Sequence, residues 1–125
     1  MFKYLDLTSF IQPIRTIIFR QIVYLRAMYL YNVTIMVEND IQGSVKQLLD
    51  TQLFSHPSPE APLSLLQMLD SPHEGTTYCV QLRCQNKDDI PAFQQRHLAS
   101  IQALLNERHP GKVVFFDSIM EYLND

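Results

Sequence analysis

The sequence predicts an α+β protein in which a four-stranded antiparallel sheet carries two helices on one face. Three observations lead to this prediction. Residues 29–38 alternate with a period of two, two later segments carry apolar residues at helical spacing, and clusters of proline, glycine and aspartate separate these from shorter apolar runs. The chain has 125 residues, of which 46% are hydrophobic and 18% charged, as is typical of globular proteins. We therefore expect one main domain of this class.

The first strand and the first helix follow Met28. The two faces of the strand are unlike, with Tyr29, Tyr31, Val33, Ile35 and Val37 on one and Leu30, Asn32, Thr34, Met36 and Glu38 on the other. Asn39 then offers a helix-capping side chain, with a glutamine three residues later. Apolar residues at helical spacing predict about three turns of helix, weakened by Gly43: Ile41, Val45, Leu48, Leu49 and Leu53.

Prolines and turn formers divide the middle of the chain. Pro57, Pro59 and Pro62 lack backbone donors and predict a loop, after which residues 63–69 indicate a second strand. Turn-forming residues 70–75 connect it to a third strand over residues 76–84, where alternation resumes. The second and third strands are expected to form a hairpin.

A second helix and a last strand complete the pattern. Asp88 and Asp89 suit a helix start, and Pro91 is tolerated in the first turn. The expected inner face carries Phe93, His97, Ile101, Leu104 and Leu105, and Pro110-Gly111 ends the helix. Residues 113–116 predict a short last strand, and 118–123 are expected to form a helical tail. The order β-α-β-β-α-β is the ferredoxin-like pattern, which places both helices on one face of the sheet.

The other face of this sheet is left open. The residues expected on it are Asn32, Thr34, Met36, Cys79, Gln81 and Arg83, with Leu66 and Met68 as contributors from the second strand. This mixture is too polar for a core and too apolar for a surface that stays wholly wet. Homodimerisation through the open faces solves this, because one self-complementary patch covers both.

Residues 1–27 differ in composition from the rest of the chain. They contain four basic residues and one acidic residue, a balance of +3, whereas residues 28–125 contain six basic and twelve acidic residues, a balance of −6. We interpret 1–27 as an N-terminal extension that could lie upstream of a true start at Met28, and 28–125 as the ferredoxin-like domain. A basic arm that binds a membrane surface is the weaker alternative, because its apolar stripe is blurred. Charges in the segment exclude a signal peptide and a transmembrane span.

The ionisable and cysteine residues exclude several classes of function. Cys79 and Cys84 lie in one strand on opposite faces, so they cannot pair with each other, and reduced thiols favour a cytoplasmic protein. The four histidines do not stand at ligand spacing, so we expect no metal. We expect no cofactor, since the three glycines form no phosphate loop. Nucleic acid is an unexpected partner, because the domain has no basic cluster.

Five residues are candidates for a functional site. His97 is a candidate acid or base if burial moves its pKa, although a histidine that packs and hydrogen-bonds locally is the interpretation we favour. Arg83 is a candidate anion holder; we prefer a role in pairing with a carboxylate across a dimer interface. Three polar residues of the open face, Gln81, Thr34 and Asn32, are candidate ligand contacts. Cys79 has no sequence neighbour that would activate its thiol.

The segment from Met28 resembles the opening of a small bacterial family catalogued as a domain of unknown function. The run Met-Tyr-Leu-Tyr-Asn-Val-Thr-Ile-Met-Val is similar to its first strand, Thr-Tyr-Cys-Val-Gln (77–81) to its third, Arg96-His97 to the second helix, and Gly-Lys-Val-Val-Phe (111–115) to the last strand. The resemblance implies a dimeric α+β barrel form of the fold and brings no activity with it. The family's tryptophan-bearing first helix is replaced by Val-Lys-Gln-Leu-Leu (45–49), and Asp117 stands where an arginine is expected.

Two functions follow from these observations. The first is a cytoplasmic homodimer that binds a protein partner or a small ligand through the open sheet face. The second is a cofactor-independent enzyme of the dimeric α+β barrel kind, with His97 as acid or base and Arg83 as anion holder. The sequence contains no catalytic constellation that would favour the enzyme.

Overall fold

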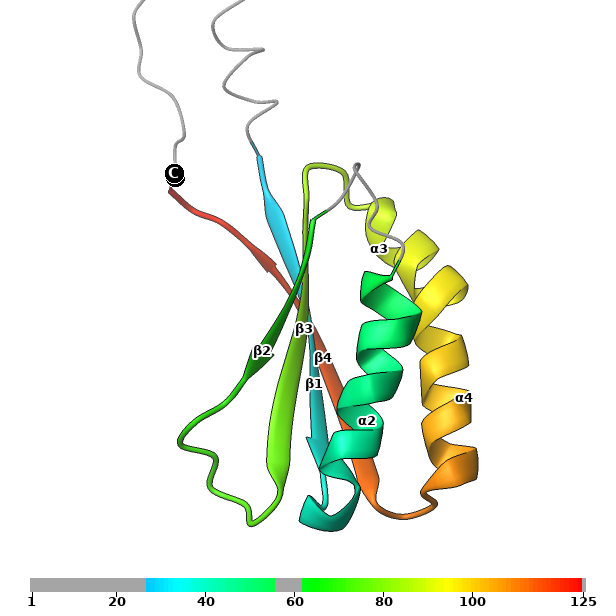
Figure 1. The fold of residues 1–125 in the computed structure, drawn as a ribbon. Coiled ribbons are helices and arrows are strands. Elements are labelled where there is room, and N and C mark those ends of the chain that lie inside the picture. Colours follow the sequence, from blue (N-terminus) through cyan, green and yellow to red (C-terminus); the bar gives the residue numbers. More distant parts are fainter. Residues whose placement is uncertain (1–26, 56–61, 125) are drawn as a thin grey trace, which may run out of the picture.

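One antiparallel sheet and two helical segments make up the described part of the chain (Figure 1). The computed structural model describes residues 27–55 and 62–124. The strands are β1 (Tyr29–Val37), β2 (Leu63–Gln67), β3 (Thr76–Cys84) and β4 (Val113–Glu121). The first helical segment comprises η1 (Asn39–Ile41), α2 (Gln42–Leu49) and η2 (Asp50–Phe54), and the second comprises α3 (Asp89–Phe93), η3 (Gln94–Leu98) and α4 (Ala99–Arg108). The expected extension 1–27, apart from Ala27, and residues 56–61 of the proline-containing loop lie outside the described residues.

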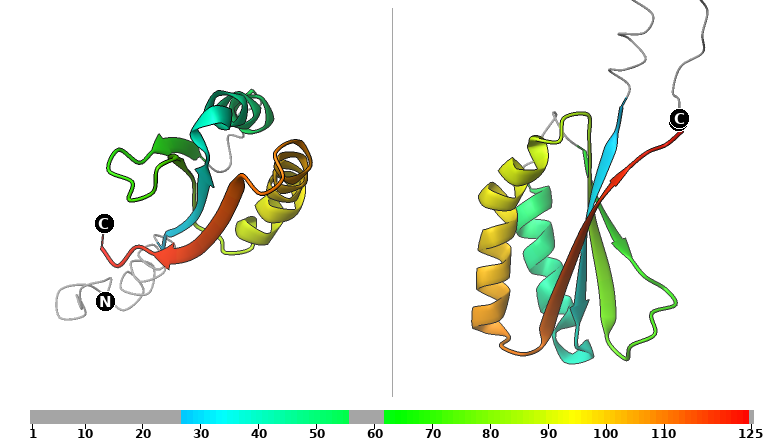
Figure 2. Two further views of the ribbon diagram at one scale, coloured as in Figure 1. Left: turned by 90° about the horizontal axis from the view of Figure 1, so that it is seen from below. Right: turned by 180° about the vertical axis from the view of Figure 1, so that it is seen from behind.

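The strand order β2-β3-β1-β4 confirms the ferredoxin-like prediction. β1 pairs with β3 and with β4 along all nine of its residues, so that Val33 lies between Val80 and Asp117. Both helical segments cover the same face of the sheet, and no helix of residues 27–55 and 62–124 lies on the other face (Figures 1 and 2). The fold is thus a two-layer α+β arrangement with one open side.

The core fills the space between the sheet and the helices. Alternate side chains of β1 are at most 1% exposed, namely Tyr31, Val33, Ile35 and Val37. They pack in one cluster with Val45 and Leu49 of α2 and with Ile101 and Leu105 of α4. Full burial of each aliphatic side chain contributes about 1.5–3 kcal/mol. The strict alternation of β1 is therefore the sequence feature that fixes which face receives the helices.

The connection between β2 and β3 folds back against the open face. His73 Nδ1 accepts the backbone N–H of Gly75 at 3.0 Å, so in the neutral ring Nε2 carries the proton and donates to Thr77 Oγ1 at 2.8 Å. A Cβ on Gly75 would lie 1.9 Å from the Val37 carbonyl oxygen, so the close approach requires glycine. This loop buries Thr77, which is otherwise placed on the open side.

The C-terminal tail was predicted wrongly. β4 continues to Glu121 instead of ending at Phe116, and residues 118–121 are strand rather than helix. The reason is that β1 presents a nine-residue edge, and Leu30 and Asn32 near its start need hydrogen-bonding partners. Met120 and Ser118 supply them. The second strand also ends earlier than expected, at Gln67.

Two details of the helices also differ from expectation. The Asn39 side chain does not cap the first helix; its Nδ2 donates to the Glu74 carbonyl at 2.7 Å and ties the helix start to the β2–β3 connection. In the second helix, η3 is a π-helical turn, in which the Ala99 N–H bonds to the Gln94 carbonyl. Because a π-helical turn contains one residue more than an α-helical turn, Leu98 occupies the buried position expected for His97. His97 itself is exposed. The predicted inner position of His97 was wrong for this reason.

Candidate functional site: the open face of the sheet

The side chains that point away from the helices form a surface that we call the open face. Its residues are Leu30, Asn32, Thr34 and Met36 of β1, Ser64 and Leu66 of β2, Thr77, Cys79, Gln81 and Arg83 of β3, and Val114, Phe116, Ser118 and Met120 of β4. Arg83 is the only charged residue among them. A sheet face that stays in water ordinarily carries many charged side chains. The charge of this protein is therefore concentrated elsewhere.

A polar row crosses the middle of the open face. The strand register aligns Ser64, Gln81, Asn32 and Ser118 across the four strands. Gln81 Nε2 donates to Asn32 Oδ1 at 3.2 Å, and Asn32 Nδ2 donates to Thr34 Oγ1 at 3.0 Å. Three of the predicted ligand contacts, Asn32, Thr34 and Gln81, thus lie together in one hydrogen-bonded group. These bonds fix the orientation of the two amide groups.

Two rows that contain large apolar side chains lie on either side of the polar row. On one side Leu66, Cys79, Thr34 and Phe116 share a row, and on the other Arg83, Leu30 and Met120 share one. Phe116 is 58% exposed, and Leu66, Val114 and Met120 are each close to half exposed. Large apolar side chains that gather on one face in this way mark interaction surfaces.

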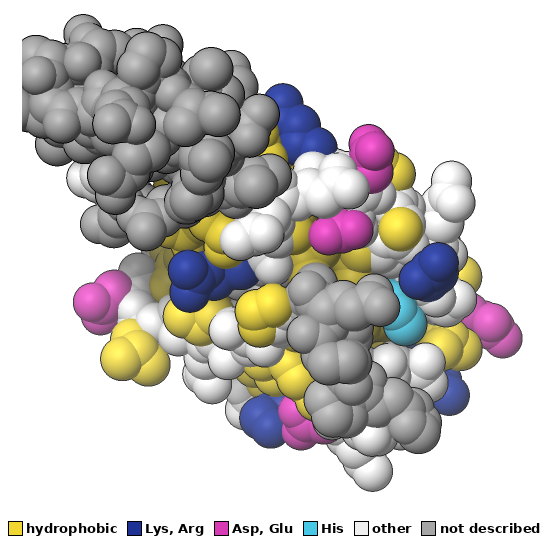
Figure 3. Space-filling view, turned by 90° about the horizontal axis from the view of Figure 1, so that it is seen from above, with side chains coloured by type: hydrophobic (Ala, Val, Ile, Leu, Met, Phe, Trp, Pro, Cys, Tyr) yellow, Lys and Arg dark blue, Asp and Glu magenta, His cyan; other side chains and the backbone are white. Residues whose placement is uncertain are grey.

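Arg83 lies at one end of the open face. Its guanidinium stands 5.5 Å from the centre of the Tyr122 ring, beyond the end of β4. This arrangement is a cation–π contact, which holds the charge at the border of the apolar surface. Figure 3 looks onto this end of the molecule, where exposed hydrophobic side chains lie beside basic ones.

His97 lies on the other side of the sheet. It stands on the exposed surface of the second helix, with its ring centre 5.7 Å from that of Phe93. The helices and the open face are on opposite sides of the sheet (Figure 2). The structure therefore groups Asn32, Thr34 and Gln81, places Arg83 at the end of the same face, and leaves His97 apart from all four.

A polar group that the sequence reasoning missed lies between the sheet and the second helix. The buried Tyr31 hydroxyl donates to Asp117 Oδ2 at 2.7 Å and accepts from Gln94 Nε2 at 3.0 Å. Burial raises the pKa of Tyr31 to about 12; Gln94 lowers that pKa and Asp117 raises it. The π-helical turn begins at Gln94, so the local distortion that exposes His97 starts at this contact. A tyrosine on a core-facing strand position, whose hydroxyl needs a partner, was the available signal.

Comparison with known families assigns the domain. A family described as "Domain of unknown function (DUF4286)" has a model that matches residues 28–123. This chain belongs to the DUF4286 family. The match begins at Met28, where the resemblance of the first strand also begins. No curated protein matches the chain significantly.

Solved structures resemble the DUF4286 domain in fold. A de novo designed protein, Foldit4, has a TM-score of 0.50 at 11% identity, over 73% of this chain and 96% of its own. A protein from Thermus thermophilus described as PII-like and signalling has a TM-score of 0.39 at 13% identity, over 77% and 90% of the two chains. CPII from Thiomonas intermedia K12, a nitrogen regulatory PII-like protein, has a TM-score of 0.40 at 11% identity, over 78% and 95%. Likeness at these identities concerns the fold alone.

The described part of the DUF4286 domain holds no group of three or more histidine, cysteine or acidic residues that could bind a metal ion. Both cysteines are free, and they lie on opposite faces of β3. Burial, and next the nearby Asp89, raises the pKa of the Cys84 thiol. In the ranges 27–55 and 62–124, no helix is long and apolar enough to cross a membrane.

Proposed function

We propose that this protein is a cytoplasmic, homodimeric interaction module in which two copies pack their open faces together as a dimeric α+β barrel. The observation that carries the proposal is the charge distribution on the open face. In the whole chain 18% of residues are charged, yet Arg83 alone is charged among the strand residues of that face. Depletion of charge with exposure of large apolar side chains characterises the cores of protein interfaces.

The layout of the open face suits a second copy. A two-fold axis along the polar row would set the amides of Asn32 and Gln81 against their counterparts. It would also set Phe116 of each copy against Met120 of the other, so that two large apolar side chains meet on either side of the axis, while Arg83 would lie opposite Cys79. A four-stranded sheet of this length presents roughly 550 Å² in flat projection. Because side-chain relief increases the accessible area, the face approaches the roughly 800 Å² that each partner buries in a stable complex.

Pairing through the outer edge of β4 is the competing arrangement, and Asp117 argues against it. This carboxylate lies at the centre of the nine-residue strand. A symmetric antiparallel pairing centred there would set two carboxylates opposite each other, and like charges in that position are destabilising. A charged residue in an edge strand is a common way to block such pairing. Face-to-face packing therefore fits the sequence of β4 better.

The cytoplasmic part of the proposal is supported by the thiols. Cys79 and Cys84 are free, and disulfides are rare where glutathione keeps thiols reduced. The enzyme alternative has no comparable support, because His97 and Arg83 lie on opposite sides of the sheet and would not act on one substrate in one subunit.

Sedimentation velocity at micromolar concentration tests the homodimer. β4 offers a matched pair of positions, because Phe116 on the open face and Ile119 on the other face are 58% and 57% exposed. We expect a dimer for the wild type and for Ile119→Glu, and a monomer with unchanged circular dichroism for Phe116→Glu, since a buried unpaired charge disrupts an interface. A monomeric wild type, or equal dissociation by both substitutions, would overturn the proposal.

A further inference from the structure

The outer edge of β2 carries backbone groups that the sheet does not use. The Met68 N–H bonds to the Thr77 carbonyl at 2.9 Å, and the Arg83 N–H bonds to the Pro62 carbonyl at 3.3 Å. In an antiparallel ladder these bonds alternate, so the even-numbered residues of β2 direct their backbone N–H and C=O groups to β3. The odd-numbered residues Leu63, Leu65 and Gln67 therefore direct their N–H and C=O groups outward. Among the described residues, no strand pairs with this edge.

A cleft lies between this edge and the first helix. It consists of two neighbouring hollows of about 530 and 370 Å³, which share Lys46, Asp50, Gln67 and Tyr78 in their linings. Phe54 and Leu65 add apolar side chains to the smaller hollow, and Gly43 leaves room in the larger one. The side chains of Leu63, Leu65 and Gln67 point to the helix side of the sheet, because they pair with the helix-facing residues of β3. The free edge and the cleft are therefore adjacent.

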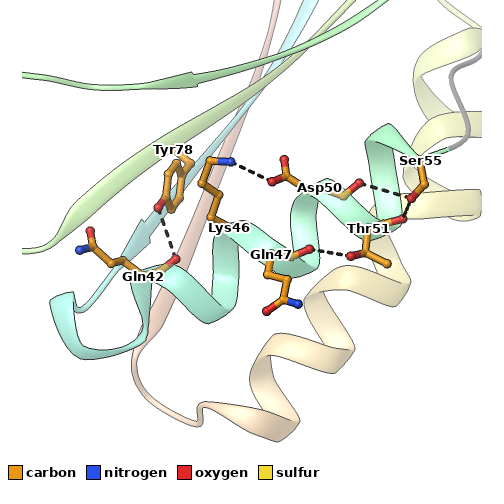
Figure 4. Close-up of polar contacts among 7 residues, drawn as sticks. All are labelled: Gln42, Lys46, Gln47, Asp50, Thr51, Ser55 and Tyr78. Atoms are coloured by element: carbon orange, nitrogen blue, oxygen red, sulfur yellow. Dashed lines mark hydrogen bonds and ion pairs between the residues drawn. The ribbon is translucent and has the colours of Figure 1, made fainter.

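Three of the polar side chains that border the cleft, Lys46, Asp50 and Tyr78, have partners within the domain. Lys46 rises from α2 beside the Tyr78 ring and turns to Asp50, whose Oδ2 it contacts at 2.8 Å (Figure 4). The Tyr78 hydroxyl donates to the Gln42 carbonyl at 3.3 Å, and burial raises the pKa of this tyrosine. With these side chains occupied, the cleft offers apolar contacts and the amides of Gln47 and Gln67, and the regularly spaced hydrogen-bonding groups come from the backbone of β2.

We propose that the β2 edge and this cleft bind an extended segment of a partner protein, which adds to the sheet as a fifth strand. Backbone bonds to Leu63, Leu65 and Gln67 would supply affinity, and aliphatic side chains at alternate positions of the segment would enter the cleft. The segment is neutral or basic, because residues 28–125 contain six basic and twelve acidic residues. The proposal names a partner class for the interaction module, but it rests on the edge and the cleft and does not require the dimer.

The other edge of the sheet does not offer the same site. The outward-facing residues of β4 are also the odd-numbered ones, because Glu38 donates to Lys112 and Tyr122 to Met28. They include Asp117 and Glu121, and charged side chains in an edge strand are a common way to block the addition of another strand. The sequence of β2, Leu-Ser-Leu-Leu-Gln, contains no charge and no internal proline. Of the two edges, β2 is the one open to strand addition.

Amide NMR on the full chain tests the proposal with a synthetic probe. The probe is an acetylated and amidated seven-residue peptide of alternating leucine and threonine with one terminal lysine. The control is the same peptide N-methylated at the backbone nitrogens on the side that would face β2. We expect saturable shifts of the amides of Leu63, Leu65 and Gln67 with the probe, and none with the control. No saturable shift at millimolar probe, equal binding by the control, or shifts confined to the open face would each overturn the inference.

A pair of substitutions at one position adds a second test. Gln67→Pro removes an outward N–H that the β2–β3 ladder does not use, and proline is tolerated at such edge positions. Gln67→Ala keeps that N–H. Both variants lose the glutamine side chain that lines the cleft, so they differ only in the backbone N–H. We expect Gln67→Pro to bind the probe about fivefold or more weakly than Gln67→Ala, as for loss of one hydrogen bond. Equal affinities of the two variants would refute the role of the edge. Binding by a monomeric Phe116→Glu variant would uphold the inference even if the homodimer proposal failed.

Discussion

Removal of the Tyr31 hydroxyl should destabilise the domain more than removal of any comparable tyrosine hydroxyl. In Tyr31→Phe, a donor to the Asp117 carboxylate and an acceptor for Gln94 are lost together. A hydrogen bond to a charged group contributes about 1.5–3 kcal/mol and a neutral one about 0.5–1.5 kcal/mol. Because Asp117 is exposed and can return to water, we take the lower end of both ranges and expect a loss of about 2 kcal/mol in the free energy of unfolding.

Tyr78→Phe is the matched control, since it removes a buried hydroxyl that makes one neutral bond of 3.3 Å to a carbonyl. We expect this variant to lose about 0.5–1 kcal/mol. Urea denaturation at one fixed protein concentration measures both, and with an m-value of roughly 1–3 kcal/mol/M a loss of 2 kcal/mol moves the midpoint by about 0.7–2 M. If Tyr31→Phe lost no more than Tyr78→Phe, the assignment of Tyr31 as the centre of this polar group would be wrong.

The difference in stability between the wild type and Tyr31→Phe should also depend on pH. The pKa of Tyr31 is raised from about 10 in the unfolded chain to about 12 in the fold, so folding favours the neutral hydroxyl. Its contribution to stability is fully present below pH 10 and is lost as the pH rises toward 12. The stability gap between the wild type and Tyr31→Phe should therefore narrow over this range. A gap that widened above pH 10 would contradict the sign of the shift.

Two further predictions concern the glycines and the thiols. Gly75→Ala should destabilise the domain by about 1–3 kcal/mol or more, since its Cβ would overlap the Val37 carbonyl. Gly43→Ala has no atom within 4 Å of the new Cβ and should stabilise α2 by about 0.5–1 kcal/mol. Thermal denaturation measures both changes in stability, and two changes of the same sign would count against the close approach at Gly75. The two thiols can be compared in the native Phe116→Glu monomer by alkylation followed by mass spectrometry. The buried Cys84, whose pKa is raised, should react more slowly than Cys79. Faster reaction of Cys84 would contradict its burial.

Local patterns were sufficient to predict most of the fold. The alternation of β1 predicted both its span and its buried face, because period-two burial is a local property of the chain. The nine-residue extent of β4 was not predictable in this way, since residues 118–121 carry no strand alternation strong enough to exclude a helix. Their conformation depends on Leu30 and Asn32, nearly ninety positions earlier in the sequence, to which they pair. Strand segments whose conformation depends on partners far away in the sequence are therefore the hardest to predict from local patterns.

The candidate site was predictable to a similar degree. Strand alternation alone predicted that Asn32, Thr34 and Gln81 share the open face, and the strand register brings them into contact. The polar contact of Tyr31 with Asp117 and Gln94 required three elements that are far apart in sequence. His97 was misplaced because helical spacing assumes 3.6 residues per turn throughout, and a π-helical turn has no signal in the residues that form it.

The π-helical turn has a consequence for how relatives of this domain are compared. Its one surplus residue shifts the second half of the helix, so that Phe93 and Leu98 are successive core positions five residues apart. In a homologue whose helix is regular, the corresponding core positions would be four residues apart. An alignment without a gap would then equate His97 with a core residue of the relative and Leu98 with a surface one. Placing a single-residue gap between 94 and 98 restores the correspondence of Ile101 and Leu105, and it removes the apparent inward histidine from this family member.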